Sequence, residues 1–353
     1  MADSPVRRAF PIYLTLLWAI LTICGILLVV ELADVLVLLF VSVLFAAALS
    51  GPVDRLARLR IPRAVSAVAI YLVALAAIGV VLWLVVPTLL QQTAELADEA
   101  PTYVDRYETL RDRYEDLRES FPALAPFDSQ VSRLGDRILE WAGDRAVALP
   151  GAFFELFLDV LAVFVISLLL VTNRERIGRF ALSLVSPEHR PKTREVGVKM
   201  WQRVGYYLRA KVIVMAIVGT ITYFALLLIG VPFALMLAVI VALGEAIPRA
   251  GPWLARIPLL GVALLEGLGT FGLTFAASVV IENAKGYVIS PVVEGDQLDI
   301  HPLLVFVSVL AGGALLGVAG AFVAVPFAAM LQVLVEEVVV PWRRRELGEP
   351  APG

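Results

Sequence analysis

The chain of 353 residues is 60% hydrophobic and only 17% charged, with a formal net charge of −3. An average soluble domain has roughly 45–50% apolar and about 25% charged residues, so this composition excludes an ordinary soluble globular protein. The single cysteine, Cys24, and two distant histidines, His189 and His301, form no recognisable zinc or haem motif. No metal, cofactor or nucleic-acid partner is therefore predicted.

Long segments without a charged residue predict helices that cross a membrane. A hydrocarbon core about 30 Å thick requires about 20 apolar residues in a helix, because unpaired backbone groups are too costly in lipid. The segments free of Asp, Glu, Lys and Arg are 10–30, 35–53, 64–94, 212–244 and 300–335. The predicted fold class is therefore all-α: a polytopic helical membrane protein in a lipid bilayer.

The first four membrane helices are predicted in the N-terminal half of the chain. Their ranges are 10–30, 34–51, 64–90 and 151–172. The first segment follows Arg7 and Arg8, as a signal peptide would, but it is too long for a signal's apolar region and lacks a clear cleavage site. A membrane helix is the preferred interpretation, with a cleaved signal as the alternative.

A polar segment between the third and fourth helices, residues 93–149, predicts a helical hairpin outside the membrane. Its apolar residues repeat at the three- and four-residue spacing of a coiled-coil seam. The first stripe is Tyr103, Tyr107, Leu110, Tyr114, Leu117 and Phe121, and the second is Val131, Leu134, Ile138 and Trp141. The stripes are expected to pack on each other or on a neighbouring protomer, and an antiparallel pair is favoured over a ligand site.

Charges in the connecting segments predict the orientation, because short loops rich in Lys and Arg stay in the cytoplasm. Residues 51–63 carry four arginines and one acidic residue, and residues 173–211 carry ten basic and three acidic residues. Residues 91–150 instead carry thirteen acidic and seven basic residues. A multi-pass protein of the cell (plasma or inner) membrane is therefore predicted, with both termini cytoplasmic and the hairpin outside.

A basic amphipathic segment, residues 191–211, precedes the fifth membrane helix, 212–230. Apolar residues fall roughly on one of its faces: Val196, Met200, Val204 and Tyr207. This pattern is typical of an interfacial helix that lies against anionic lipid.

The C-terminal third contains two apolar segments interrupted by glycine and proline. The first consists of two short runs, 233–247 and 253–266, on either side of a Pro-x-x-Gly-Pro tip. The second runs from 300 to 335 and is interrupted at Gly312, Gly313, Gly317, Gly320 and Pro326. Irregular backbone is tolerated at membrane depth only where protein or a cavity surrounds it, so both are interpreted as re-entrant hairpins. Ordinary kinked spans are the alternative.

A shift of 68 residues aligns these two segments and places Gly244 on Gly312 and Pro258 on Pro326. The alignment predicts an internal repeat, in which helix five and the first hairpin correspond to helix 268–291 and the second hairpin. Paired, interrupted segments of this kind are typical of the midplane site of secondary transporters. If the first hairpin enters from outside, the second enters from inside and the repeat is inverted. Shared small-apolar composition is the alternative explanation.

The residues of these segments resemble the autoinducer-2 exporter family of permeases, and the resemblance covers nearly the whole chain. Its residues in the first hairpin are Ile247, Pro248, Arg249, Ala250, Gly251, Pro252, Ile257 and Pro258. Those further on are Glu282, Pro291, His301, Pro302, Leu303, Gly312, Gly313, Ala314, Gly317, Gly320, Val325 and Pro326. The chain differs from the family pattern at Arg249, where an aromatic residue is common, and at Val279 and Val280, where glutamines are common.

The resemblance implies about eight membrane passes and a homo-oligomer, with a pentamer as its expected form. It also implies alternating access of an elevator type for a small solute. Family members are associated with export of the furanone-type signal autoinducer-2, and some with sodium/proton exchange. A permease or exporter for a small polar solute or an autoinducer-2-like signal is therefore expected, with ion coupling left open.

Polar residues within apolar sequence predict the transport path, because a charge in the membrane normally faces a cavity or a partner. Glu245 and Arg249 lie four residues apart at the first hairpin tip, and Glu282 and Lys285 lie three apart in the next helix. Glu245 is the preferred functional carboxylate, whereas a structural ion pair is favoured for Glu282 with Lys285. His301 is expected to cap the following helix. The predicted path comprises Glu245, Pro248, Arg249, Gly251, Pro252, Glu282, Gly312, Gly313, Gly317 and Pro326.

An enzyme is not predicted, because the sequence lacks Gly-x-Ser-x-Gly, His-Glu-x-x-His and phosphate-binding-loop motifs. A sodium/proton antiporter of the same fold and a non-transporting membrane scaffold are the alternatives to a permease. The predicted organisation is three N-terminal helices in 1–92, the outer hairpin in 93–149, helix four with the amphipathic helix in 150–211, a transport core in 212–341 and a cytoplasmic tail in 342–353.

Overall fold

The computed structural model describes residues 17–18, 20–25, 27–28, 30–120, 146–248, 250–294 and 301–347, and their regular structure is helical throughout. Within these ranges, four helices are long and apolar enough to cross a membrane, or five if one bent pair counts as a span. Shorter apolar helices accompany them. The prediction of a polytopic helical membrane protein is confirmed. The second stripe of the outer hairpin and Arg249 lie outside the described residues.

Helix α2 (Ala33–Ala57) is followed after a short turn by α3 (Arg63–Ser120), which is a single helix of 58 residues. The membrane span predicted over 64–90 matches the apolar part Arg63–Leu96, but the helix itself continues, because residues 91–100 are mostly strong helix formers with no glycine or proline. The first stripe of the outer hairpin is an extension of this membrane helix. On the extension, Tyr103 donates a hydrogen bond to Glu266 over 3.3 Å, and Arg106 forms an ion pair with the same carboxylate.

Helix α5 (Ala146–Thr172) packs against α2 and α3, and it is followed by the short helix α6 (Arg174–Ser183). The axis bends by 70° between the two helices, beside Asn173. Apolar and aromatic side chains fill the α2–α3–α5 interface, with Phe164 between Phe45 and Tyr71. These three helices form one layer of the molecule.

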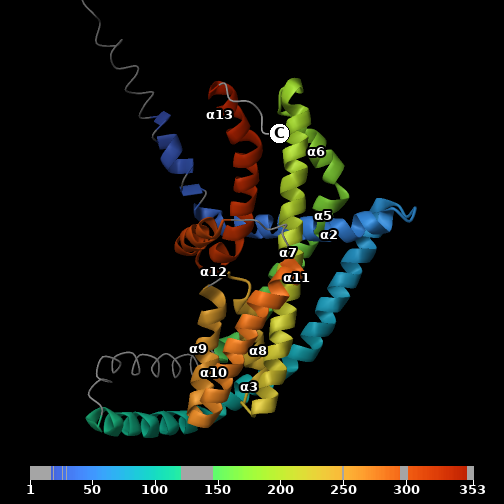
Figure 1. Cartoon of the computed structure of the whole chain (residues 1–353). Helices are drawn as coiled ribbons and strands as arrows, with labels where there is room; N and C mark the ends of the chain where they lie inside the picture. Colours follow the sequence, from blue (N-terminus) through green and yellow to red (C-terminus); the bar gives the residue numbers. More distant parts are fainter. Residues whose placement is uncertain are drawn as a thin grey trace, which may run out of the picture.

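Helix α7 (Arg190–Ile229), preceded by a short 3₁₀ turn at Pro187–His189, is unbroken for 40 residues and runs the height of the molecule (Figure 1). The predicted interfacial helix and fifth membrane helix are thus one helix, and the boundary drawn at 211/212 falls inside it. In the amphipathic part of α7, Val204 and Leu208 are buried against Leu44 of α2. The amphipathic pattern reflects packing on protein.

Close packing of α2 on α7 depends on Gly205, and this leads to a prediction. A methyl group at Gly205 would overlap the carbonyl oxygen of Ala47, whereas the Cβ of an alanine at Gly197 would have no neighbour within 4 Å. We expect Gly205→Ala to lower the stability by about 1–3 kcal/mol, as overpacking does. Gly197→Ala is the matched control, because alanine favours a helix over glycine by up to about 1 kcal/mol. Thermal unfolding in detergent measures both, and equal midpoints would contradict the expected tight contact.

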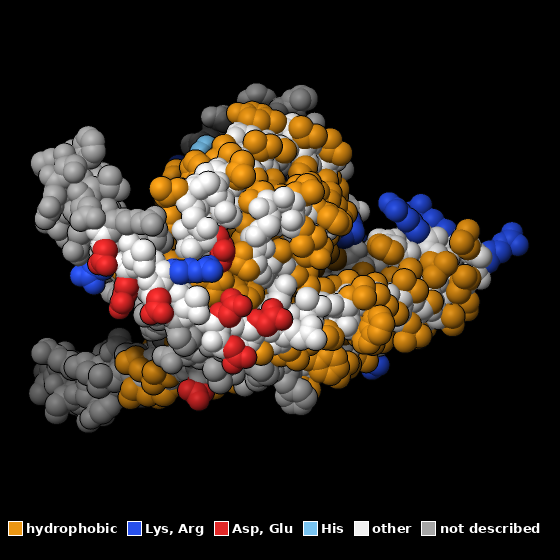
Figure 2. Space-filling view, turned by 90° about the horizontal axis from the view of Figure 1, so that it is seen from below, with side chains coloured by type: hydrophobic (Ala, Val, Ile, Leu, Met, Phe, Trp, Pro, Cys, Tyr) orange, Lys and Arg blue, Asp and Glu red, His pale blue; other side chains and the backbone are white. Residues whose placement is uncertain are grey.

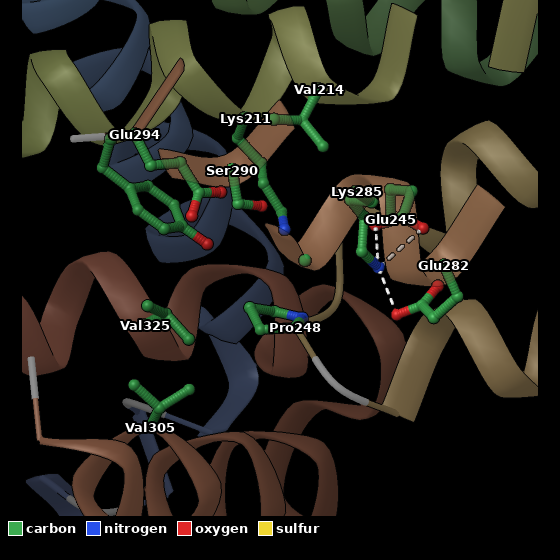
Figure 3. Close-up of a pocket in the computed structure, with 12 residues that line it drawn as sticks. Lys211, Val214, Glu245, Pro248, Glu282, Lys285, Ser290, Glu294, Val305 and Val325 are labelled. Carbon is green, nitrogen blue, oxygen red and sulfur yellow. Dashed lines mark hydrogen bonds and ion pairs between the residues drawn. The ribbon is translucent and has the colours of Figure 1, made fainter. Parts of the chain in front are cut away.

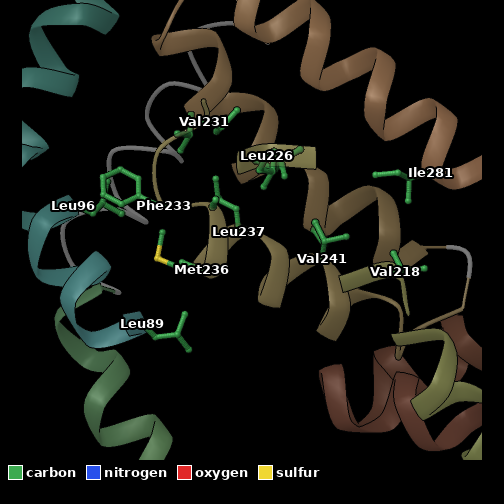
Figure 4. Close-up of a cluster of buried hydrophobic side chains, with 14 of the residues drawn as sticks. Leu89, Leu96, Val218, Leu226, Val231, Phe233, Met236, Leu237, Val241 and Ile281 are labelled. Atoms are coloured by element: carbon green, nitrogen blue, oxygen red, sulfur yellow. The ribbon is translucent and has the colours of Figure 1, made fainter. Parts of the chain in front are cut away.

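The first interrupted segment is a hairpin of two short helices, α8 (Ala234–Gly244) and α9 (Ala250–Leu265). The chain reverses from α7 into α8 through left-handed backbone at Gly230 and at Phe233. Phe233 tolerates this conformation because its ring is buried and packs on Tyr103. The hairpin contributes to the largest apolar core, in which α8 side chains such as Leu237 share one cluster with side chains of α3, α7 and α10 (Figure 4).

The hairpin is followed by α10 (Leu268–Ala284), which continues through a π-helical turn at Lys285–Ile289 into α11 (Ser290–Glu294). This confirms the helix predicted over 268–291. Figure 1 shows α8, α9 and α10 side by side at the lower end of the view, with α11 next to the middle of α7. The π turn is a local irregularity of a kind that is frequent at functional sites.

The second interrupted segment is α12 (Pro302–Leu334), which is broken at Leu316 and Gly317. Residues eight apart on a straight helix would be about 12 Å apart, yet Gly312 and Gly320 are in contact, so the chain folds back on itself. The second limb then continues through the π turn Val335–Val339 into α13 (Val340–Leu347). His301 caps α12, as predicted, because its Nδ1 accepts a hydrogen bond from the backbone N–H of Leu303.

Both hairpins are closed by glycine contacts, and the first glycine of each contact, Gly244 or Gly312, matches under the shift of 68 residues, whereas the second is one residue out of that register. In the first, Gly244 faces Gly251, and in the second, Gly312 faces Gly320. In each pair, a Cβ atom on the second glycine would overlap the carbonyl oxygen of the first. Only glycine permits backbones to approach so closely. The same device therefore holds both broken segments as hairpins.

The outer surface is largely apolar, as expected for a protein surrounded by lipid. Figure 2 shows hydrophobic side chains over most of the lower face. In the same view acidic side chains gather toward one side, and basic side chains gather at the opposite end, where the α2–α3 turn lies. That turn contains Arg58 and Arg60, and the α3 extension carries exposed acids such as Asp98 and Glu108.

Candidate functional site

A pocket of about 390 Å³ lies where the first hairpin tip approaches α7, the α10–α11 helix and α12 (Figure 3). Five of its side chains are ionisable carboxylates or amines, and four are apolar. The lining residues are Tyr207, Lys211, Val214, Glu245, Pro248, Glu282, Lys285, Gly286, Ser290, Glu294, Val305 and Val325. The pocket volume falls within the range of about 300–1,000 Å³ that is usual for small-molecule sites.

The broken tip of the first hairpin places Glu245 and Pro248 on the pocket wall. The α8 helix ends at Gly244, where contact with Gly251 forces the chain to turn sharply. Glu245 therefore follows directly after the helix, and its side chain is only 1% exposed. Next to it, Ile247 packs against the cluster of Val309, Ala321 and Val325 in the second hairpin. The tip of one hairpin thus rests on the flank of the other.

Lys285 joins two carboxylates at the π turn. Its ammonium lies 3.1 Å from both carboxylate oxygens of Glu245 and 2.6 Å from Glu282, as the dashed lines of Figure 3 mark. Arg256 of α9 donates a hydrogen bond of 2.7 Å to the other oxygen of Glu282. Four side chains thus form a network of two cations and two anions that links both limbs of the first hairpin to α10. The predicted pair of Glu282 with Lys285 is confirmed, and Glu245 also binds Lys285.

The burial of this network makes its internal charge balance important. Arg256, Lys285 and Glu245 have side chains that are 4%, 13% and 1% exposed. Removing a buried charge from water costs several kcal/mol, which an ion pair offsets only with good geometry and further hydrogen bonds. Because each charge here contacts an opposite one, the network is compensated as a whole, whereas loss of one member would leave a buried charge unpaired.

Three side chains of α7 line the pocket, and none of them was among the predicted path residues. Tyr207, Lys211 and Val214 recur at spacings of four and three residues, which places them on one helix face. Lys211 was counted among the cytoplasmic basic residues, yet it is only 8% exposed. The available signal was its position as the last charge before the long uncharged run of 212–244, four residues after a tyrosine. Ser290 and Glu294 of α11 line the pocket as well, and they too were absent from the predicted path.

The structure divides the predicted path residues into two groups. Glu245, Pro248 and Glu282 line the pocket. Others shape the hairpins without lining it: these are Gly251, Pro252, Gly312, Gly313, Gly317 and Pro326. The break of the second hairpin is turned away from the pocket, because the neighbouring Leu315 and Val318 are 80% and 76% exposed. The pocket therefore lies between one tip and one flank, and not between two tips.

Comparison with known proteins agrees with this architecture. A family model described as "AI-2E family transporter" matches residues 15–340. A protein named "Putative transport protein YrrI" from Bacillus subtilis is 24% identical over 281 residues, which cover 78% of each chain. "Putative permease PerM" from Escherichia coli K12 is 30% identical over 209 residues, which cover 59% of this chain and 58% of that protein.

A further relative, "Putative transport protein YueF" from Bacillus subtilis, is 21% identical over 296 residues, which cover 82% of this chain and 80% of that protein. The fold and these similarities define a polytopic helical membrane protein of the transporter class. Because the family model spans nearly the whole sequence, this chain belongs to the AI-2E family of transporters.

Proposed function

We propose that this protein is a carrier, and not an enzyme, that moves a small polar solute across the cell membrane through the pocket at the first hairpin tip. The observation that carries the proposal is the pocket itself, which lies beside a broken helix and is lined by charged side chains within an apolar protein. Discontinuous helices that place polar groups near the membrane midplane are the usual construction of secondary-transporter sites.

The length of α8 supports a midplane position for the pocket. Its 11 residues rise about 16 Å, roughly half of the hydrocarbon thickness of about 30 Å. A helix of this length that enters from one surface ends near the middle of the bilayer. Glu245 at its end is therefore well placed to contact a solute half-way across.

The ion-pair network favours a mechanism in which the first hairpin moves during transport over one in which it stays fixed. Glu245 and Arg256 belong to the hairpin, whereas Glu282 and Lys285 belong to the helix that follows it. Ion pairs across such a boundary can exchange partners when the hairpin shifts, which permits two discrete arrangements. We propose alternating access between them, with both termini cytoplasmic and the protein a homo-oligomer in the plasma membrane.

Accessibility of pocket cysteines tests the proposal without knowledge of the solute. Cys24 is the single native cysteine, so Cys24→Ser gives a background free of thiols. We expect Val305→Cys in this background to react with a membrane-impermeant maleimide added to either side of sealed vesicles, because alternating access exposes the pocket to both sides in turn. The reaction rates from the two sides measure this exposure.

Two comparisons make the accessibility result decisive. A cysteine in place of Phe224, a side chain 57% exposed on the outer face of α7, is the control for reaction through lipid and should remain unreactive. A non-transporting scaffold predicts that Val305→Cys reacts from one side at most. Labelling from a single side, with intact oligomers and sealed vesicles, would contradict a carrier.

A further inference from the structure

We propose that the solute is a small organic monoanion, and that Lys211 binds its carboxylate or an equivalent oxyanion. This inference rests on the proposed carrier function and adds the chemical class of the solute. It starts from the charged side chains of the pocket that are not part of the ion-pair network. Of the pocket's ionisable side chains, Glu245, Glu282 and Lys285 bind one another, whereas Lys211 and Glu294 stand outside the network.

The buried ammonium of Lys211 makes no direct ion pair in the described part of the chain, although Glu294 and Glu245 of the same pocket attract it from a greater distance. Lys211 is 8% exposed, and no described carboxylate lies within 4 Å of its amine. Figure 3 shows its amine directed into the pocket, between Ser290 and Pro248. A buried ammonium is favourable only when a negative or accepting group contacts it directly, and no described carboxylate lies within 4 Å of Lys211. An anionic solute would meet that requirement.

Neutral hydrogen-bond donors surround the same position. Tyr207, one turn before Lys211, is 5% exposed, and its hydroxyl has no hydrogen-bond partner among the described residues. Ser290 of α11 presents a hydroxyl between Glu294 and Lys211, as Figure 3 shows. An ammonium with two hydroxyls matches the several lone pairs of a carboxylate, and charge-assisted hydrogen bonds of this kind are the strong ones.

The other walls limit the size and charge of the solute. Val214, Pro248, Val305 and Val325 offer apolar contacts to a short carbon skeleton, and the volume of about 390 Å³ excludes a large one. Glu294 lies beyond Ser290 in Figure 3, at the side of the pocket away from the network. Its carboxylate would repel a second negative charge and accept a hydrogen bond from a hydroxyl. A hydroxy-monocarboxylate therefore fits better than a dicarboxylate.

The experiment uses the full chain in lipid nanodiscs, with lactate, propionate, succinate and glycerol as probes, and binding measured from the shift of the unfolding midpoint. We expect lactate to bind best, propionate and succinate more weakly, and glycerol not at all. Lys211→Met should weaken lactate binding by about tenfold to a hundredfold, the range expected when one charge-assisted hydrogen bond is lost. Lys211→Arg should retain most of the affinity.

The control is Lys199→Met, because Lys199 lies on the same helix but is exposed and pairs with Glu195 and Glu337 outside the pocket. Its lactate affinity should equal that of the native chain. The inference is overturned if Lys211→Met binds lactate normally, if glycerol matches lactate, or if the native chain binds none of the three carboxylates. Labelling of Val305→Cys from both sides would still support a carrier in those cases, so the two proposals fail separately.

Discussion

Gly251→Ala and Gly320→Ala are expected to be among the most damaging single-methyl additions in the protein. At either position the new methyl overlaps a backbone carbonyl oxygen across a hairpin, that of Gly244 or that of Gly312. Backbone cannot rotate away as a side chain can, so the two limbs must separate. We expect each variant to lose about 3 kcal/mol of stability, the upper end of the usual cost of overpacking.

Gly313→Ala is the matched control for the second hairpin. Its methyl would lie 3.8 Å from the Cβ of Ala321, an ordinary contact, and alanine is the better helix former. Thermal unfolding of the solubilised protein distinguishes these cases, and size-exclusion chromatography checks that assembly persists. If Gly320→Ala and Gly313→Ala unfold together, the second broken segment does not form the tight hairpin described above.

Lys285→Met is the second change with a large expected effect. It removes the partner of the buried Glu245 and one of the two partners of Glu282. Breaking a buried ion pair from one side typically costs about 3–5 kcal/mol, because an uncompensated charge remains. The double variant Lys285→Met/Glu245→Gln should be more stable than Lys285→Met alone, since the amide carries no charge to compensate.

The control for this loss is Lys192→Met. Lys192 is 47% exposed and binds Glu195 and Glu337 in water, and pairs of that kind contribute about 0–1 kcal/mol. Chemical unfolding at two salt concentrations separates the classes, because salt screens exposed pairs more than buried ones. If the losses of stability of the two single variants simply add in the double variant, and Glu245→Gln restores no stability to Lys285→Met, Glu245 and Lys285 do not compensate each other.

The class of fold was predictable because it depends on composition over long segments. Uncharged runs predicted the membrane helices, and glycine and proline predicted the two interrupted segments near residues 244–258 and 312–326. Helix lengths were predicted less well. Polar composition after residue 90 was taken as the end of a helix, yet Gln, Glu and Ala continue a helix readily in water. The α3 helix therefore crosses from lipid to solvent without a break.

The site was predicted only where it coincides with a local pattern. Glu245 was identifiable because it interrupts apolar sequence beside a proline, and Glu282 with Lys285 because helical spacing brings them together. The bond between Glu245 and Lys285 joins residues 40 positions apart and depends on how the hairpin folds. Lys211 was missed for a related reason: a lysine at the end of a basic segment has the same sequence signature whether it faces water or a pocket.

The unbroken α3 helix also has a mechanical consequence. Its polar C-terminal half contacts Glu266, at the connection between α9 and α10, through Tyr103 and Arg106, and its apolar N-terminal half packs against α2 and α5. A neighbouring subunit or an antibody fragment bound to the polar half of α3 would therefore also restrain the connection between α9 and α10, at the base of the first hairpin. In the carrier proposed above, such a partner would restrain the first hairpin without any ligand in the pocket.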